Sequence, residues 1–266
     1  MRHRAPDRTL LAVGGALGVL VLLAVAAPLL APHGAEAIDL AARRAAPSVA
    51  HWFGTDEIGR DVMARVLHGG RVSLAVGIAS AVVAIALGVV IGAAAGWRGG
   101  VIDAILMRGT DAMLAIPRLP FLMIAGAILE PSVPMLVLLV GVAGWMETAR
   151  VVRAEVLSLR ARAFVEAARA GGATSWRIAV RHLLPNAAPA ILVSATLAVG
   201  RGILLESALS FFGVGVQPPT ASWGNMLYQA QTTMVSEPWL AIFPGLFIFA
   251  TVVSINALGD RLAAAA

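Results

Sequence analysis

Residues 166–185 read EAARAGGATSWRIAVRHLLP, a polar stretch in a chain dominated by apolar runs. It carries three arginines, a glutamate and a histidine. Gly171 and Gly172 interrupt two groups of helix-forming residues. Thr174 is a typical N-cap for the second group, and Pro185 marks the entry to the next apolar run. The pattern predicts a short helix, a glycine turn and a second helix outside the membrane.

The rest of the chain has the composition of a membrane protein. Of its 266 residues, 59% are hydrophobic and only 13% are charged, which is more apolar surface than a soluble domain hides. A membrane-spanning helix needs about 20 mostly apolar residues. Three uncharged runs meet this length: Thr9–Ala31, Val72–Gly96 and Pro238–Leu258. Three others are shorter or interrupted: Ala112–Leu129, Pro131–Met146 and Leu183–Phe212. We therefore expect an all-α membrane protein with about six transmembrane helices.

The distribution of arginine predicts the orientation of these helices. The loop 150–182 contains seven arginines, whereas the segment 213–237 contains none. Basic residues concentrate in cytoplasmic loops, so both termini and a loop at about 150–186 are expected in the cytoplasm. The segment 33–71 is expected outside although it contains five arginines, which are accompanied by five acidic residues. We expect an amphipathic stretch at 56–67 within it, and divide the chain into an N-terminal helix plus external loop (1–71) and a core of about five helices (72–266).

Charged residues inside the apolar runs are candidate functional groups. Arg118 lies between Pro117 and Pro120 in the third run, and Arg201 and Glu206 interrupt the fifth. An arginine near the bilayer centre costs between about 2.5 and more than 10 kcal/mol, so such residues usually face a bundle interior or a water-filled path. We interpret them as lining a polar translocation pathway. Two alternatives remain for Arg118: it pairs with an acid on a neighbouring helix, or the span lies elsewhere.

The composition excludes several kinds of chemistry. The chain has no cysteine, and all 20 basic side chains other than histidine are arginine. Without lysine there is no P-loop for ATP. The five histidines are dispersed, and neither HExxH nor GxSxG occurs, so a membrane enzyme is disfavoured and no metal or cofactor is expected on this chain. Because the arginines lie mostly in loops, we expect the lipid bilayer and no nucleic acid as a partner.

The opening stretch resembles the EAA signature of ABC-importer permease subunits. In that signature, Glu-Ala-Ala is followed by three residues, a glycine, nine residues and Ile-x-Leu-Pro. His182 stands at the position of the isoleucine. Residues 53–74, 206–227 and 238–249 also resemble the dipeptide/oligopeptide/nickel branch of these permeases, and the likeness is closest to the C-type subunit of a dipeptide permease. The residues that match the signature are Glu166, Ala167, Ala168, Gly172, Leu184 and Pro185.

The resemblance implies a type I ABC importer fold in a bacterial-type inner or plasma membrane. It implies a heterodimer with a second, homologous permease subunit. One or two nucleotide-binding ATPase domains would bind ATP and Mg²⁺, and an extracytoplasmic binding protein would deliver the ligand. The EAA loop would be a coupling helix seated in a groove of the ATPase. There Glu166 would contact a basic residue, Gly172 would allow the sharp turn, and Pro185 would direct the chain back into the membrane.

Residues 206–227 would form the outer gate or the contact with the binding protein. The candidates there are Phe212, Gly213, Pro218 and Trp223. Arg118 and Arg201 are unusual for the family, in which small or apolar residues are expected. The implied ligand is a dipeptide, with oligopeptides, glutathione-like peptides, haem-like ligands and nickel chelates left open. A self-sufficient channel or secondary transporter, using the intramembrane charges, is the alternative; the inverted repeats typical of such proteins are not evident in the sequence.

Overall fold

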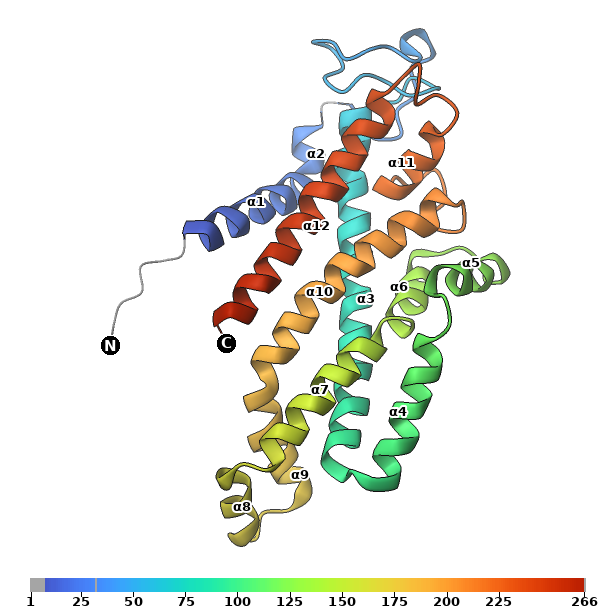
Figure 1. Ribbon diagram of the computed structural model, residues 1–266. Coiled ribbons are helices and arrows are strands. Elements are labelled where there is room, and N and C mark those ends of the chain that lie inside the picture. Colours follow the sequence, from blue (N-terminus) through green and yellow to red (C-terminus); the bar gives the residue numbers. More distant parts are fainter. Residues whose placement is uncertain (1–7, 32, 266) are drawn as a thin grey trace.

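A single long helix, α3 (Val62–Arg98), forms the central rod of the computed structural model, which describes residues 8–31 and 33–265 (Figure 1). Its 37 residues correspond to a length of about 55 Å at 1.5 Å per residue. The Asp61 side chain accepts a hydrogen bond from the Ala64 amide at 2.8 Å and so caps the first turn. Three helices pack along α3: α6 (Val133–Val142), α7 (Trp145–Arg160) and α10 (Leu184–Phe211).

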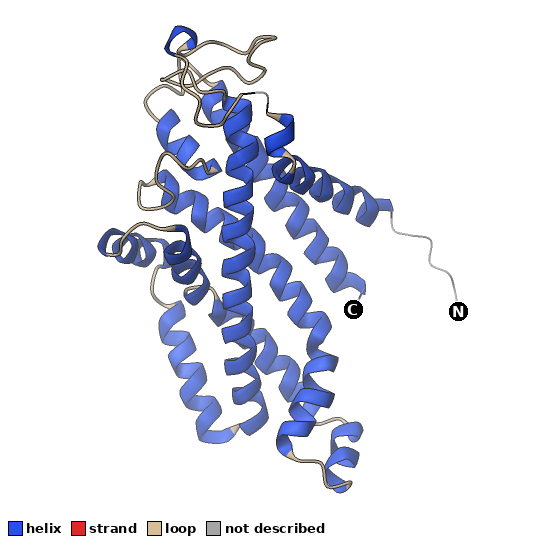
Figure 2. Ribbon diagram, turned by 180° about the vertical axis from the view of Figure 1, so that it is seen from behind, coloured by secondary structure: helices blue, strands red, loops and turns tan. Residues whose placement is uncertain are grey.

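The other elements are helices as well. Figure 2 shows helices and loops alone, and no strand occurs in residues 8–31 and 33–265. The remaining elements are α1 (Arg8–Val25), α2 (Ala27–Leu30), the 3₁₀ turn η1 (Leu40–Ala42), α4 (Gly100–Leu114), α5 (Arg118–Ile128), α8 (Ala163–Ala170), α9 (Ser175–Ile178), the π-helical η2 (Ala179–Leu183), α11 (Trp223–Ala230) and α12 (Trp239–Ala265). The all-α prediction is therefore confirmed.

The predicted spans correspond to three long helices, two bent pairs and one shorter apolar helix. Val62–Arg98, Ser175–Phe211 and Trp239–Ala264 are each long and apolar enough to cross a membrane. The pairs α4–α5 and α6–α7 bend by 82° and 42° and raise the number of candidate spans to five. The first predicted span is shorter than expected, because the helix breaks at Ala26, ahead of Pro28; proline cannot donate the backbone bond that would continue it.

Two predicted boundaries also differ from the structure. The segment 56–67 is not a separate amphipathic element: residues 56–61 form a loop, and the first turns of α3 follow directly. On the other side, residues 150–160 belong to α7, so the polar loop begins after Arg160 and not at Arg150. Both differences arise because helices continue past the apolar core of a span as long as their residues favour helix and one face stays packed.

A stripe of glycines brings α3 and α7 into close contact. Gly88, Gly92 and Gly96 recur at four-residue spacing, on the face of α3 that meets α7. A Cβ atom added at Gly88 would lie 2.6 Å from the Thr148 Cβ, and one added at Gly96 would lie 2.9 Å from the Arg153 carbonyl oxygen. Small residues at this spacing let two helix backbones approach closely. Helices α3 and α7 therefore pack as one unit with no room for side chains between them.

Candidate functional site

The polar stretch that opens the sequence forms a helical hairpin at one end of the molecule. Helix α8 lies beyond the lower end of the bundle and α9 returns the chain toward α10, whereas the loop 33–61 lies at the opposite end (Figure 1). The predicted order of helix, glycine turn and helix is confirmed. Thr174 is the predicted N-cap of α9, and its hydroxyl accepts a hydrogen bond from the Arg177 amide at 3.3 Å.

An apolar joint fixes this hairpin to the bundle. Val165 of α8, Ile178 of α9 and Leu183 of η2 are all almost completely buried. They pack together with three residues from the last turns of α7 and with the start of α10. The contributing residues from α7 and α10 are Val152, Val156, Leu159 and Ala187. Because interiors of this kind are close-packed, the hairpin cannot shift without moving α7 or α10.

The turn between α8 and α9 depends on glycine. Gly172 has φ +79°, a left-handed conformation that non-glycine residues adopt at a cost. Its amide donates to the Arg169 carbonyl at 3.0 Å, and the next amide, of Ala173, donates to Ala168 at 3.0 Å. A Cβ added at Gly172 would meet nothing within 4 Å. The glycine is therefore required here by backbone conformation and not by crowding within this chain.

The hairpin leaves a small, uncluttered outer surface. Glu166 and Ala167 are exposed, and Ala168 is half-buried against the apolar joint. Trp176, at the first turn of α9, is 77% exposed, although a tryptophan is usually buried for the most part. Sequence reasoning assigned no functional role to Trp176, which is the second residue of α9. Exposed apolar residues rimmed by charge typify protein contact sites.

The last two residues of the signature occupy the junction with α10. Leu184 is half-buried and Pro185 is exposed, in the first turn of that helix. Proline has no amide to donate, so it leaves a gap in the helical hydrogen-bonding ladder at this junction. The π-helical turn η2 immediately before it is a local irregularity in the hydrogen-bonding ladder. The structure therefore brings all six signature residues into one hairpin and its exit.

Two of the predicted intramembrane charges meet a carboxylate that sequence reasoning missed. Arg118 Nη2 forms an ion pair with Glu147 Oε1 of α7, and Arg201 Nη1 of α10 lies 3.8 Å from the same oxygen. The second oxygen, Oε2, is buried and has no hydrogen-bond partner among the described residues. A cavity of about 560 Å³ is lined by Arg118 and Glu147 of this cluster, and also by Phe121 and Leu205. In the sequence, Glu147 is recognisable only as an isolated acidic residue directly after an apolar run.

Arg118 itself lies where the third span breaks. Pro117 is the N-cap of α5, and the chain turns by 82° between α4 and α5. The bend confirms the prediction that the prolines break the helix. The alternative in which Arg118 pairs with an acid on a neighbouring helix is also confirmed, because Arg118 forms an ion pair with Glu147. Glu206 forms no ion pair with Arg118 or Arg201 within the described residues. The Glu206 carboxylate is fully buried and accepts hydrogen bonds from the Ser73 and Ser210 hydroxyls at 2.9 and 2.8 Å.

The residues predicted at the outer gate separate into exposed and buried sets. Phe212, Gly213 and Pro218 are exposed in the turn that follows α10. Trp223 is only 1% exposed, and its indole donates to the Val66 carbonyl of α3 at 2.9 Å. The resemblance implied Trp223 as an outer-gate or contact residue, whereas α11 packs it against α3 in this conformation.

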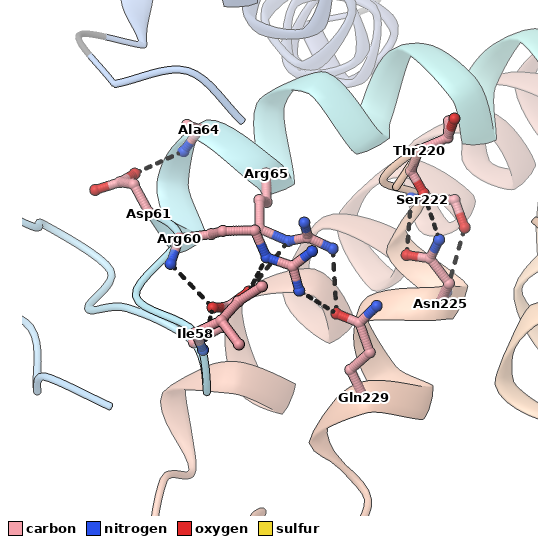
Figure 3. A network of polar contacts seen from close by, with 10 residues as sticks. Ile58, Arg60, Asp61, Ala64, Arg65, Thr220, Ser222, Asn225 and Gln229 are labelled. Atoms are coloured by element: carbon pink, nitrogen blue, oxygen red, sulfur yellow. Dashed lines mark hydrogen bonds and ion pairs between the residues drawn. The ribbon is translucent and has the colours of Figure 1, made fainter. Parts of the chain in front are cut away.

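A buried ionic network fixes α11 to the loop before α3 (Figure 3). Asp56 accepts from the Arg60 guanidinium at 2.6 Å and lies 3.7 Å from that of Arg65. Both arginines also donate to the Gln229 side-chain oxygen of α11, at 3.2 and 3.1 Å. Removing one member of such a buried network leaves the remaining charges buried without a partner. The network therefore holds the end of the molecule opposite α8 in one arrangement.

The chain matches the family described as binding-protein-dependent transport system inner membrane component over residues 88–266. It is 40% identical to the dipeptide transport system permease protein of Bacillus subtilis, over 91% of this chain and 76% of that protein. It is also 40% identical to the glutathione transport system permease protein of Pectobacterium atrosepticum, over 94% of this chain and 84% of that one.

A third relative is the oligopeptide transport system permease protein of Bacillus subtilis, 36% identical over 92% of this chain and 80% of that protein. The family match covers the core helices from within α3 to the end of the chain, including the hairpin. This membership decides against a self-sufficient channel or secondary transporter. The chain belongs to the binding-protein-dependent transport system inner membrane component family, the permease subunits of ABC importers.

Proposed function

We propose that this chain is the permease subunit through which partner ATPases drive the uptake of short peptides, dipeptides first among them. The peptide ligand is supported by the dipeptide, oligopeptide and glutathione transport named for its relatives. The partners are a second, homologous permease, one or two nucleotide-binding domains that hold ATP and Mg²⁺, and an extracytoplasmic binding protein. The chain lies in the inner or plasma membrane with both termini in the cytoplasm.

The observation that carries the mechanism is the apolar joint beneath α8. Glu166 and Ala167 face outward, while Val165 and Ile178 bind the hairpin to α7 and α10. In this proposal, the outer surface sits in a groove of the ATPase and Glu166 contacts a basic residue there. When ATP brings the nucleotide-binding domains together, the hairpin moves with them. The joint passes this movement to α7 and α10, the inner gate changes state, and the peptide is then released inward by alternating access.

The cluster of Arg118, Glu147 and Arg201 is the proposed polar part of that path. It borders a cavity of about 560 Å³ in a chain with few other intramembrane charges, and charges at such depth usually face a path or a bundle interior. Phe212, Gly213 and Pro218, exposed at the opposite end from α8, are proposed as outer-gate or binding-protein contacts. The buried Glu206 has a structural role between α3 and α10.

Replacement of Glu166 by glutamine tests the coupling assignment. The complete importer is reconstituted in proteoliposomes, with binding protein outside and ATP inside, and uptake of a labelled dipeptide is measured. Glu166→Gln is expected to lower uptake while the permease still inserts into the membrane. The matched control is Glu130→Gln, which removes the same charge from an exposed position between α5 and α6. Equal uptake by both variants would show that Glu166 does not couple the permease to the ATPase.

A further inference from the structure

Three side chains with metal-binding atoms gather at the end of the molecule opposite α8. His33 and His51 come from the loop that follows α2, and Asp61 immediately precedes α3. One ligand atom from each lies within 4.8 Å of the other two. The Asp61 Oδ2 atom is 2.9 Å from the His51 Nδ1 and 3.7 Å from the His33 Nδ1. Neither the proposed function nor the network around Asp56 uses these residues.

The spacing of the donors suits a tetrahedral cation. Zinc bonds to histidine nitrogen and carboxylate oxygen are about 2.0–2.2 Å long, which places ligands at tetrahedral corners about 3.4 Å apart. The two distances to Asp61 Oδ2, 2.9 and 3.7 Å, lie on either side of that value. The third separation, between the two imidazole nitrogens, is within 4.8 Å, so the two histidines would move toward each other to hold one ion. The His33 side chain is 46% exposed, so the fourth position is accessible to water.

The electrostatics of Asp61 also favour a cation at this position. Its side chain is only 3% exposed, and buried carboxylates are normally paired or bound to a metal. One oxygen, Oδ1, is used by the N-cap bond to Ala64. Figure 3 shows the Asp61 carboxylate turned away from the guanidinium groups of Arg60 and Arg65. Those two groups form ion pairs with Asp56 instead. Within the described residues, the ion-pair partners of Asp61 are the two imidazoles alone.

We propose that His33, His51 and Asp61 form a binding site for a divalent transition-metal cation, with Zn²⁺ as the preferred ion and water as the fourth ligand. Two imidazoles and one carboxylate are typical zinc ligands, whereas Ca²⁺ and Mg²⁺ favour oxygen donors only. The ion neutralises the buried carboxylate. It also ties the loop 33–51 to the first turn of α3, without disturbing the N-cap bond made by the other carboxylate oxygen.

Zinc titration of the intact importer tests the site. The complex is purified through a tag without histidine, stripped with a chelator and titrated with ZnCl₂ by calorimetry. Asp61→Asn is informative because asparagine still accepts the N-cap bond, and His33→Gln alters an exposed residue. Each is expected to weaken one zinc site at least about 10- to 100-fold, since even outer-sphere partners of a metal ligand have effects of that size. His68→Gln, a histidine of α3 outside the cluster, is the control and should leave zinc affinity unchanged.

Hydrogen exchange supplies a second measurement, independent of transport and of zinc sites on partner subunits. Zinc is expected to slow exchange of the amides in residues 33–61 in the unaltered complex and in His68→Gln. The slowing should vanish in Asp61→Asn and His33→Gln. The proposal would be overturned if both site variants had the same zinc affinity and the same amide hydrogen exchange as the unaltered complex. An equal loss of zinc binding in the His68→Gln control would also overturn it.

Discussion

Shortening a single buried side chain in the apolar joint should uncouple ATP hydrolysis from transport. The change is Val165→Ala. Val165 of α8 is fully buried against residues of α7 and α9, and the substitution removes two methyl groups. At about 0.8 kcal/mol for each buried group, the lost transfer free energy is about 1.6 kcal/mol, and the cavity left behind raises the cost to about 2–3 kcal/mol.

That free energy matters because α8 has only eight residues. Isolated helices shorter than about 12–15 residues are marginal in water, so the joint supplies most of the stability of α8. A loss of about 2–3 kcal/mol reduces the ratio of seated to detached hairpin by roughly 30-fold or more. The exposed surface proposed to meet the ATPase is unchanged by the substitution. Hydrolysis should therefore continue while its movement is no longer passed to α7 and α10.

The assay measures dipeptide taken up per ATP hydrolysed in proteoliposomes that contain the complete importer. Val165→Ala is expected to lower this ratio several-fold with little change in the ATPase rate. The control is Val180→Ala, which removes the same two methyl groups from a position in the same loop that is 40% exposed. If Val165→Ala and Val180→Ala gave the same ratio as the unaltered importer, a rigid joint would not be the transmitting element.

Three further substitutions test other parts of the structure. Gly172→Asn should keep more dipeptide uptake than Gly172→Ala, because asparagine tolerates a φ of +79° that costs alanine about 1–2 kcal/mol; equal uptake would assign the glycine another role. Glu147→Gln should lower the Tm of the complex more than Asp111→Asn, whose ion pair is more than half exposed, and equal shifts in Tm would contradict this. Asp56→Asn should destabilise the fold by up to about 3–5 kcal/mol, because it leaves the buried Arg65 without its carboxylate partner. Unaltered denaturant unfolding would show that the network does not stabilise the fold.

The parts of the fold that were predictable from sequence are those with local causes. The glycine turn at Gly172 and the cap at Thr174 follow from backbone conformation and from one side-chain oxygen, so short-range patterns identify them. The break of the third span follows in the same way from Pro117. The long uncharged run within α3 is likewise visible as composition. None of these depends on which helices become neighbours.

The features that sequence reasoning missed depend on packing between distant segments. Glu147 and Arg118 are brought together only because the bend between α4 and α5 places the first residue of α5 beside the first turn of α7. Trp223 was a candidate outer-gate or contact residue, yet α11 places it against α3. The His33–Asp61 cluster joins two ends of a loop that has little regular structure. Hydrophobic periodicity reports which face of a helix is buried, but it does not identify the residue on the opposing helix.

The two ends of the molecule are linked through one helix and not through a chain of weak contacts. Near α8, the Arg160 guanidinium donates to the Gly96 and Trp97 carbonyl oxygens at 3.2 and 2.9 Å, which fixes the end of α7 to the end of α3. The close glycine packing extends this contact along both helices. At the other end, the first turn of α3 carries Arg65 and its network with α11. A rigid helix that takes part in both contacts moves them together. Displacement of α8 must therefore either reposition the opposite end or break the contact between α3 and α7. Because the helices are in close contact at the glycines, repositioning the opposite end costs less free energy.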